Sequence, residues 1–441
     1  MKKIFSLAAL FLAGQIAAQT RIEITRKDGS IQTYEQQTVI PDYTIHTLTL
    51  GWNDTLQIQD LKSLRYTRDG LDWNLQWKLY DNPYHYRFGY GAVMHVRDMM
   101  TADVLRPSNG YNWFGNWEAA RGLGKNILFG QGVFNALRTL TIEANEWIRA
   151  LKDAGEDSQG WLGAAYACRA LAYLDMARMY EFLPNDRVPG ISESGQDITG
   201  LTVPLIDENT EFDTQTSFYS VPRATKAEAV AFIERDLEDA EQLITKLDES
   251  SHMLPHLDAV YGLKARLHLW TGDYAKARTY ARKAIEATDT HIMTADEMTN
   301  PQRGFNQLSN WMWGVQHFPE DQVVTSGIVN WTSWLSNEYV SGYAGINQAS
   351  VNALYIDKSL YERMTDSDVR KLLFVAPAGT TLYDQCRNLV LDMYMMNHPY
   401  ASLKFRPNQG ETSDVQGLCT AFPLMRVEEM YLIEAEAAAH T

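Results

Sequence analysis

The residues best suited to chemistry in this chain are aromatic side chains that stand beside amides. They are Tyr111, Asn112, Trp113, Asn116 and Trp117 in one group, Trp311 and Trp313 in a second, and Trp331 and Trp334 in a third. A sugar ring has a flat face of C–H groups and a rim of hydroxyls. An exposed indole or phenol ring covers the flat face, and an amide binds the hydroxyls. The pattern therefore predicts a surface that binds saccharide rings.

The same aromatic residues are also compatible with a packed core. Trp311 and Trp313 share a parity, so they can face one side of a buried strand as well as a ligand. Trp117 precedes a helical pattern and can act as a staple contact at its start. Trp113 follows a loop with proline and glycine and is the favoured site residue. We expect Trp113→Ala to abolish saccharide binding without a shift in melting temperature.

Motifs of catalysis and of cofactor binding are missing. The sequence has no Gly-x-Ser-x-Gly, no His-Glu-x-x-His, no phosphate-binding loop and no spaced Cys/His set for zinc. Asp98 and Asp103 resemble an acid–base pair, but a structural role at a helix end is favoured. Asp207, Asn209, Glu211 and Asp213 form an alternating row of oxygen ligands. The row lacks the glycine and the twelfth-position Glu of an EF-hand loop, which favours a solvated acidic loop over a calcium site. We expect no enzyme, no metal and no cofactor.

Charge and the first residues limit the class of protein. The 441 residues include 39 Lys and Arg against 55 Asp and Glu, a net charge of −16. An acidic chain without a long basic run is a poor candidate for binding nucleic acid or an anionic membrane. Lys2 and Lys3 precede a short apolar run, and small residues follow at Ala17 and Ala18. This pattern predicts an export signal over residues 1–18.

Apolar and polar residues alternate in the N-terminal part of the chain. The alternation recurs at residues 21–25, 31–34, 47–50 and 55–58. Asp28 and Gly29 have the sequence of a hairpin turn between the first two of these segments. We therefore predict a small β subdomain over residues 19–67.

The apolar period becomes helical from about residue 90. We predict a buried helix at 161–182, a helix at 225–247 that begins with a capping box from Thr225 to Glu228, a helix–turn–helix at 257–288 and a last helix at 422–440. Residues 289–420 are irregular and rich in Gly, Asn, Trp and Tyr. Long irregular insertions in helical arrays usually carry function.

Five stretches of the sequence carry a family resemblance. They are residues 88–103, 164–173, 222–240, 258–287 and 422–437. The fourth contains A-R-L-x-L-x-x-G-D-Y-x-K-A, and the last contains L-x-R-x-x-E-x-Y-L-x-x-A-E-A. Together they resemble the SusD/RagB family of nutrient-binding proteins at the outer membrane of Bacteroidetes.

The resemblance implies a mostly α-helical fold. Its scaffold would be TPR-like helix pairs over residues 68–441, with the irregular binding half at about 289–420. It implies non-enzymatic binding of oligosaccharides or polysaccharides at the outer face of the outer membrane. It also implies delivery to a SusC-like, TonB-dependent transporter, and the family places glycan-contacting aromatics in the regions of the three aromatic groups. Alternatives are a peptide-binding relative, or a helical-repeat scaffold without a small ligand.

Three features of the sequence depart from the family or leave a question open. Family members carry a cysteine for a lipid anchor just after the signal, and this chain has none there. Retention through the transporter is then the expectation. The helix at 422–440 would need a further partner helix, so we expect additional residues at the C-terminus. Cys386 and Cys419 can form a disulfide in an oxidising compartment, but their positions in the sequence do not decide this.

Overall fold

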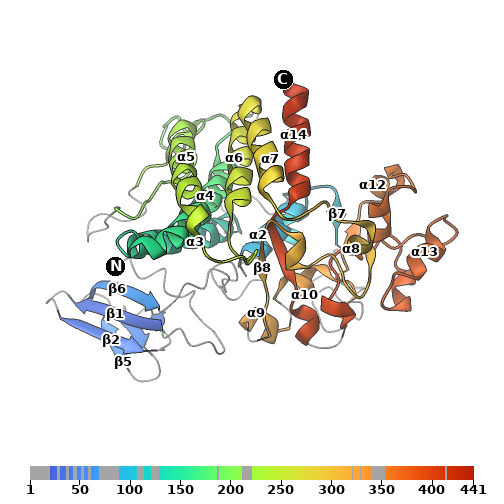
Figure 1. Cartoon of the computed structure of the whole chain (residues 1–441), viewed down its shortest axis with the longest axis horizontal. Helices are drawn as coiled ribbons and strands as arrows, with labels where there is room; N and C mark the ends of the chain where they lie inside the picture. The colour runs from blue at the N-terminus through green and yellow to red at the C-terminus, as the bar shows by residue number, and fades with distance from the viewer. Residues whose placement is uncertain are drawn as a thin grey trace. The chain divides into compact units, whose positions relative to one another are not determined.

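The structure is a computed structural model of the chain (Figure 1). It describes residues 20–26, 30–35, 39–42, 47–50, 54–57, 61–68, 89–106, 114–120, 129–185, 188–210, 221–319, 321–327, 329–338, 353–412 and 415–441. The predicted export signal at 1–18 lies outside the described residues.

The chain forms two compact units. The first comprises residues 1–76 and 137–243, and the second comprises residues 77–136 and 244–441. Each unit therefore contains two separate stretches of sequence. The predicted domain boundary at residue 67 stays a prediction.

Six short strands form two antiparallel sheets in the N-terminal part. They are β1 (Thr20–Arg26), β2 (Ile31–Glu35), β3 (Val39–Asp42), β4 (Thr47–Leu50), β5 (Asp54–Gln57) and β6 (Leu61–Arg68). The strand orders are β2-β1-β6 and β3-β4-β5. Arg21 pairs with Glu35 and Thr25 with Ile31, which is the register of a hairpin. The predicted strands are confirmed, while the turn residues Asp28 and Gly29 lie outside the described residues.

Two packed helices form the centre of the first unit. They are α4 (Gln159–Tyr180) and α5 (Lys226–Leu243). Helix α4 is apolar nearly all round, and its residues from Leu162 to Ala177 are buried as predicted. The predicted capping box of α5 is confirmed, because the Thr225 N–H donates to Glu228 Oε2 (2.8 Å) and the Glu228 N–H donates to Thr225 Oγ1 (3.3 Å). Helix α3 (Phe129–Leu151) precedes this pair in the chain.

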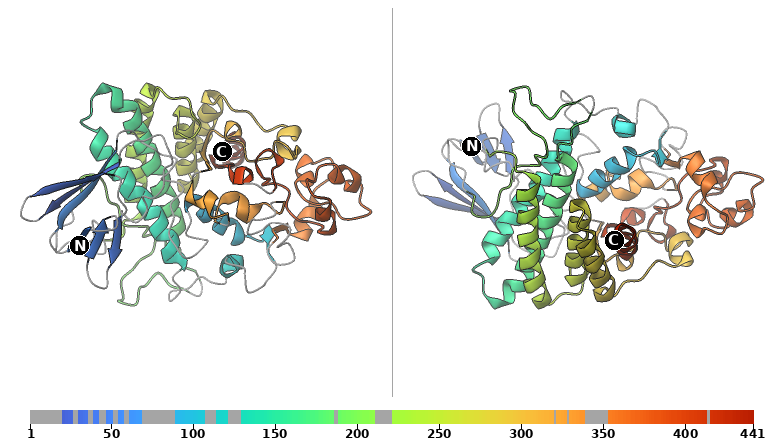
Figure 2. Two further views of the ribbon diagram at one scale, coloured as in Figure 1. Left: turned by 90° about the horizontal axis from the view of Figure 1, so that it is seen from below. Right: turned by 90° about the horizontal axis from the view of Figure 1, so that it is seen from above.

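A helix–turn–helix in the second unit confirms the prediction for residues 257–288. Helix α6 (Leu257–Thr271) ends at Gly272, whose φ of 78° is a left-handed conformation that glycine adopts without strain. Asp273 then caps α7 (Tyr274–Ala287) by accepting the Lys276 N–H. The alanines 277, 281 and 284 are fully buried, so α6 and α7 lie side by side in Figures 1 and 2.

The last helix, α14 (Val427–His440), packs on α7 and α6. Arg266 donates to both oxygens of Glu429, at 2.6 Å each, and the Tyr274 and His440 rings stack with centroids 4.0 Å apart. The prediction for 422–440 was wrong at its start, where Ala421–Met425 forms strand β10. Five apolar residues fit a buried strand as well as a helical turn, and Pro423 disfavours the helical conformation in the residue before it.

Short elements make up the remainder of the second unit. They include α2 (Gly89–Met99), β7 (Val104–Leu105), α8 (Ala295–Thr299), β8 (Trp313–Gln316), α9 (Gln322–Thr325), α10 (Trp331–Leu335), β9 (Tyr355–Ile356), α12 (Lys358–Arg363) and α13 (Tyr383–Arg387). Strand β10 pairs antiparallel with β8, and β7 with β9. The predicted irregularity of 289–420 is confirmed in its described parts. Among the described residues, no helix has the length and apolarity needed to cross a bilayer.

Candidate functional site

The structure does not describe the side chains of four residues in the first aromatic group. Tyr111, Asn112 and Trp113 lie outside the described residues. The backbone of Asn116 belongs to a 3-10 helix, Gly115–Ala120, but its side chain lies outside the description. The favoured role of Trp113 therefore stays a prediction.

The other five predicted aromatic residues are core residues. Their exposed fractions are 2% for Trp117, 0% for Trp311, 0% for Trp313, 2% for Trp331 and 1% for Trp334. A ring without solvent-accessible surface cannot present a face to a sugar. The structure therefore favours the packed-core alternative for these five indoles over the expectation that they stack on a ligand.

Helix α10 shows how the third aromatic group becomes buried. The Trp331 ring lies between Phe405 and Phe422, with centroids 5.1 and 5.3 Å away, and its Nε1–H donates to Asn306 Oδ1. Three residues later on the same helix face, Trp334 makes an edge contact with Phe114 at 5.6 Å. The Trp334 carbonyl also accepts from the Arg106 guanidinium. Both indoles are therefore part of the packed interior.

The second aromatic group packs around a glycine. A Cβ on Gly314 would lie 2.8 Å from Cδ1 of Trp311, so the indole occupies the place of the missing side chain. The other side of Trp311 meets Phe305, whose centroid is 5.2 Å away. Trp313 donates its Nε1–H to the Met253 carbonyl at 3.3 Å. Both indoles thus stabilise the β8 region.

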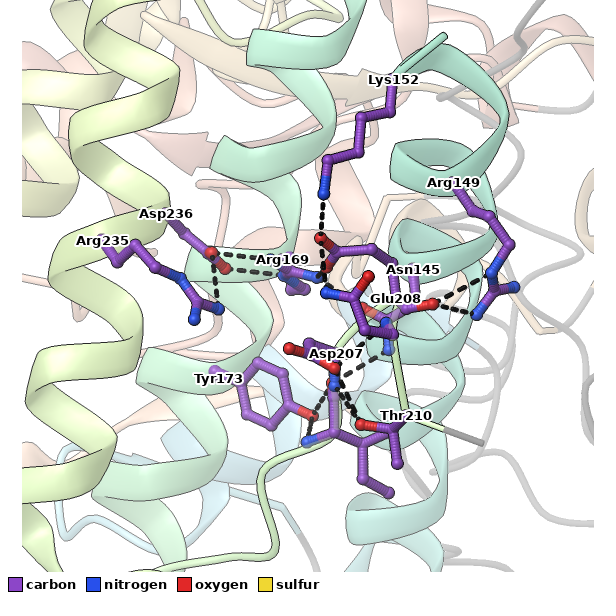
Figure 3. Close-up of polar contacts among 12 residues, drawn as sticks. Asn145, Arg149, Lys152, Arg169, Tyr173, Asp207, Glu208, Thr210, Arg235 and Asp236 are labelled. Carbon is purple, nitrogen blue, oxygen red and sulfur yellow. Dashed lines mark hydrogen bonds and ion pairs between the residues drawn. The ribbon is translucent and has the colours of Figure 1, made fainter. Parts of the chain in front are cut away.

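The first unit contains a buried polar network centred on Arg169 of α4 (Figure 3). Its Nε and Nη2 donate to the two oxygens of Asp236 on α5, each at 2.7 Å. Its Nη1 donates to Asn145 Oδ1 at 2.8 Å and to Glu208 Oε2 at 2.7 Å. Burial alone would lower the pKa of Arg169, but the hydrogen bonds that it donates to these carboxylates, together with their negative charges, outweigh this effect and raise the pKa. The guanidinium therefore joins α3, α4, α5 and the loop that contains Glu208.

The same network holds the described part of the alternating acidic loop, residues 207–210, while Glu211 and Asp213 lie outside the described residues. Lys152 and Arg149 bind the side chain and the carbonyl of Glu208 (Figure 3). Burial alone would raise the pKa of Glu208, but the hydrogen bond from Arg169 and the other donors outweigh it and lower the pKa to about 2. Asp207 Oδ1 accepts from the Asn209 N–H and from the Thr210 hydroxyl. These carboxylates are therefore used in fixing the loop.

The second unit contains a different buried ion pair. Glu338 and Arg406 are each 1% exposed, and Oε2 lies 3.4 Å from Nη1. These two atoms make no hydrogen bond, although Glu338 Oε1 accepts from the Leu391 N–H at 2.8 Å. Burial raises the pKa of Glu338, and Arg406 opposes this effect. The pair anchors the segment that follows Leu391.

The described acidic residues and cysteines give no support for metal or acid–base chemistry. No cluster of His, Cys, Asp and Glu in the described part of the chain could hold a metal ion. Asp98 lies in the last turn of α2, and Asp103 stands between α2 and β7, both exposed. All three cysteines are buried free thiols, so the possible disulfide between Cys386 and Cys419 is not formed.

Only two aromatic side chains among the described residues are exposed. They are Tyr394, with 54% of its surface exposed, and Tyr431 of α14, with 39%. Tyr394 lies in a 3-10 helix, Met393–Asn397, and Met393 beside it is also exposed. The sequence analysis missed this position. Its signal is a tyrosine followed by Met395 and Met396, which a short helix turns toward the core.

Comparisons with known proteins show a sequence match for one segment of the chain and a structural match for the fold as a whole. Residues 131–269, less than half of the chain, match the family model SusD-like_3, described as "Starch-binding associating with outer membrane". No curated protein matches the chain in sequence. Solved structures are similar over most of the chain, which confirms the expected mostly helical SusD-like fold.

Three of these structures illustrate the likeness. A SusD-like carbohydrate binding protein from Bacteroides vulgatus ATCC 8482 has 23% identity and a TM-score of 0.61, covering 83% of this chain and 69% of its own. A SusD superfamily protein from Bacteroides thetaiotaomicron VPI-5482 has 18% identity and a TM-score of 0.56, covering 78% and 70%. A laminarin binding SusD-like protein has 17% identity and a TM-score of 0.52, covering 80% and 77%.

Proposed function

We propose that this chain, a SusD-like protein by its matched segment and its fold, binds carbohydrate chains without cleaving them. The observation that carries the proposal is the match of residues 131–269 to a model described as starch-binding. Two of the similar structures are described as carbohydrate binding and laminarin binding, which supports the same ligand class. SusD-like binding proteins are non-enzymatic, in agreement with the missing catalytic motifs.

The proposal includes a location and a partner. The signal pattern at residues 1–18 would export the chain, and the matched family model is described as associating with the outer membrane. The chain would bind glycan at the outer face and pass it to a SusC-like, TonB-dependent transporter. Because no cysteine follows the signal, contact with this transporter would also hold the protein at the membrane.

The segment with Tyr111, Asn112 and Trp113 belongs to the proposed binding surface. An indole and a phenol separated by one amide offer stacking area together with hydroxyl partners. Each sugar ring buries little area, and association has its own entropic cost, so a single site is expected to bind weakly. Several aromatic positions along one glycan would then be needed for firm capture.

Affinity electrophoresis of the mature chain tests the proposal. Starch, laminarin and a panel of other polysaccharides are cast into native gels, with a peptide digest tested in parallel by calorimetry. Retardation by at least one polysaccharide, with no release of reducing ends, is the expected result. If only peptides from the digest bind, the alternative of a peptide-binding relative is favoured. If neither the polysaccharides nor the peptide digest bind and a partner protein copurifies, the alternative of a helical-repeat scaffold is favoured.

The variant Trp113→Ala locates the site within the same assay. We expect retardation to disappear while the melting temperature stays unchanged, because the indole would contact ligand and not the core. Trp331→Ala is the matched control, since a 2% exposed indole removed from the core should lower the melting temperature. If Trp113→Ala lowers the melting temperature as Trp331→Ala does, Trp113 is a core residue.

A further inference from the structure

We propose that the exposed ring of Tyr394, with Asp392 and Asn397 beside it, is a stacking position for a neutral sugar ring. The inference rests on the proposed carbohydrate binding and assigns it a described surface. The five predicted indoles that the structure describes are buried, so a stacking position on the described surface needs another aromatic ring. Tyr394 is the most exposed Phe, Tyr or Trp residue in the part of the chain that the structure describes.

The backbone that carries the Tyr394 ring is held in place. Asp392 caps the short helix by accepting the Tyr394 N–H at 2.9 Å. Met395 is fully buried and Met396 is 9% exposed, and both pack in one apolar cluster of the second unit. The helix therefore cannot rotate to bury Tyr394 without exposing these methionines. A ring that is ordered before binding loses little entropy when it meets a ligand.

A histidine extends the aromatic surface next to Tyr394. The His398 ring lies 5.2 Å away, centroid to centroid, at an interplanar angle of 59°. Its Nδ1 lies 3.3 Å from the hydroxyl of Tyr355, which fixes the imidazole in position. Burial lowers the pKa of His398, so the imidazole is neutral at neutral pH. Met393, 48% exposed, continues the apolar surface along the chain.

Polar groups for sugar hydroxyls stand at both ends of the short helix. Asp392 uses Oδ1 for the cap, and its Oδ2 has no hydrogen bond to any described residue. The Asn397 side chain is exposed and is likewise without a hydrogen bond within the described parts of the chain. A carboxylate accepts from hydroxyls and an amide both donates and accepts. The carboxylate would repel uronic acids, so the surface suits neutral glycans.

Binding of the full mature chain to a soluble neutral glucan tests the assignment. Laminarin and maltoheptaose are titrated by calorimetry into the natural chain, Tyr394→Ala, Tyr394→Phe and Tyr431→Ala. We expect about a tenfold weaker Kd for Tyr394→Ala, the loss of one stacking contact. Tyr394→Phe keeps the ring face and should bind like the natural chain. Tyr431→Ala, the matched exposed tyrosine on α14, should also leave Kd unchanged.

Three outcomes would overturn the assignment, and they can be told apart. Equal Kd values for the natural chain and Tyr394→Ala overturn the assignment of Tyr394 and leave carbohydrate binding intact. An equal loss in Tyr431→Ala overturns the assignment by showing a nonspecific effect. Absence of binding by the natural chain to every glycan overturns the proposed function together with this inference. If Tyr394→Ala has a lower melting temperature, Tyr394→Gln, which keeps the chain length without the ring, replaces it.

Discussion

Each unit buries one arginine against a carboxylate, but the two pairs are built differently. In the first unit, Arg169 meets Asp236 through two parallel hydrogen bonds of 2.7 Å. In the second unit, the Arg406 and Glu338 atoms nearest each other are 3.4 Å apart and make no hydrogen bond. Both pairs are equally hidden from water. Because the two pairs differ in hydrogen-bond geometry and hardly in burial, we expect them to contribute differently to stability.

The physical reason lies in desolvation. Removing two charges from water costs several kcal/mol per ion, and only good geometry with further hydrogen bonds compensates for this. Arg169 has such bonds to Asn145 and Glu208. Arg406 donates its Nε to the Leu403 carbonyl, while its Nη1 has no hydrogen bond. We infer that the first pair stabilises its unit and that the second is close to neutral.

The largest effect is expected from the same change in both pairs. Asp236→Asn removes one of the two carboxylate charges that pair with Arg169 and should lower the free energy of unfolding by about 3–5 kcal/mol. Glu338→Gln can keep the hydrogen bond from the Leu391 N–H, and the Oε2 atom that faces Arg406 makes no hydrogen bond that the change would remove. Its effect should stay below about 1.5 kcal/mol. Urea unfolding followed by circular dichroism measures both values.

A conservative variant controls this comparison. Arg169→Lys keeps the charge but loses the bidentate geometry, so it should lie between the natural chain and Asp236→Asn. Equal losses in Asp236→Asn and Glu338→Gln would show that the two pairs contribute alike. The contrast between them would then be wrong.

Acid should affect the network of the first unit through Glu208. Its folded pKa of about 2 lies below the ordinary 4.5. The stabilisation is therefore complete above about pH 4.5 and is lost as the pH falls through about 2. Glu208→Gln should show a shallower loss of stability between these values. Unfolding curves over this range measure it, with Glu156→Gln, an exposed glutamate of the same unit, as the unchanged control.

The smallest effect is expected at the start of α5, the helix that carries Asp236. Thr225→Ala removes the hydroxyl that accepts the Glu228 N–H and should cost about 1 kcal/mol in unfolding free energy. Thr225→Ser keeps the oxygen and should stay within a few tenths of the natural value. A loss as large as that of Asp236→Asn would mean that the cap, and not the ion pair, holds α5 in place.

Elements with local signals could be predicted from the sequence. The capping box at Thr225 and the turn at Gly272 involve residues three or four apart, so a short window contains the whole interaction. The Arg169 network could not be predicted, because Arg169 and Asp236 are 67 residues apart in the chain. Strand β10 was missed because Phe422 and Leu424 fit two periodicities at once.

The burial of the five described indoles could not be predicted for a related reason. A tryptophan next to an asparagine has the same local sequence whether its indole binds a sugar or packs inside the protein. The Trp331 indole is of the second kind, because its Nε1–H donates to the Asn306 side chain. The exposure of a side chain depends on the whole fold and cannot be inferred from the residues next to it in the sequence. Tyr394 has an ordinary local sequence, and the burial of Met395 and Met396 is what turns it outward.

The three hidden thiols have a practical consequence for labelling. Cys168, Cys386 and Cys419 are all buried, and burial raises the pKa of Cys168 and of Cys386. Thiol-directed dyes react with accessible thiolates, so we expect the folded natural chain to react very little with maleimides. A cysteine introduced by Asn388→Cys, an exposed residue six positions before Tyr394 and outside the proposed sugar contacts, would then carry a single fluorophore at a chosen place. Its emission would report ligand arrival beside Tyr394 in real time, without removal of any natural cysteine.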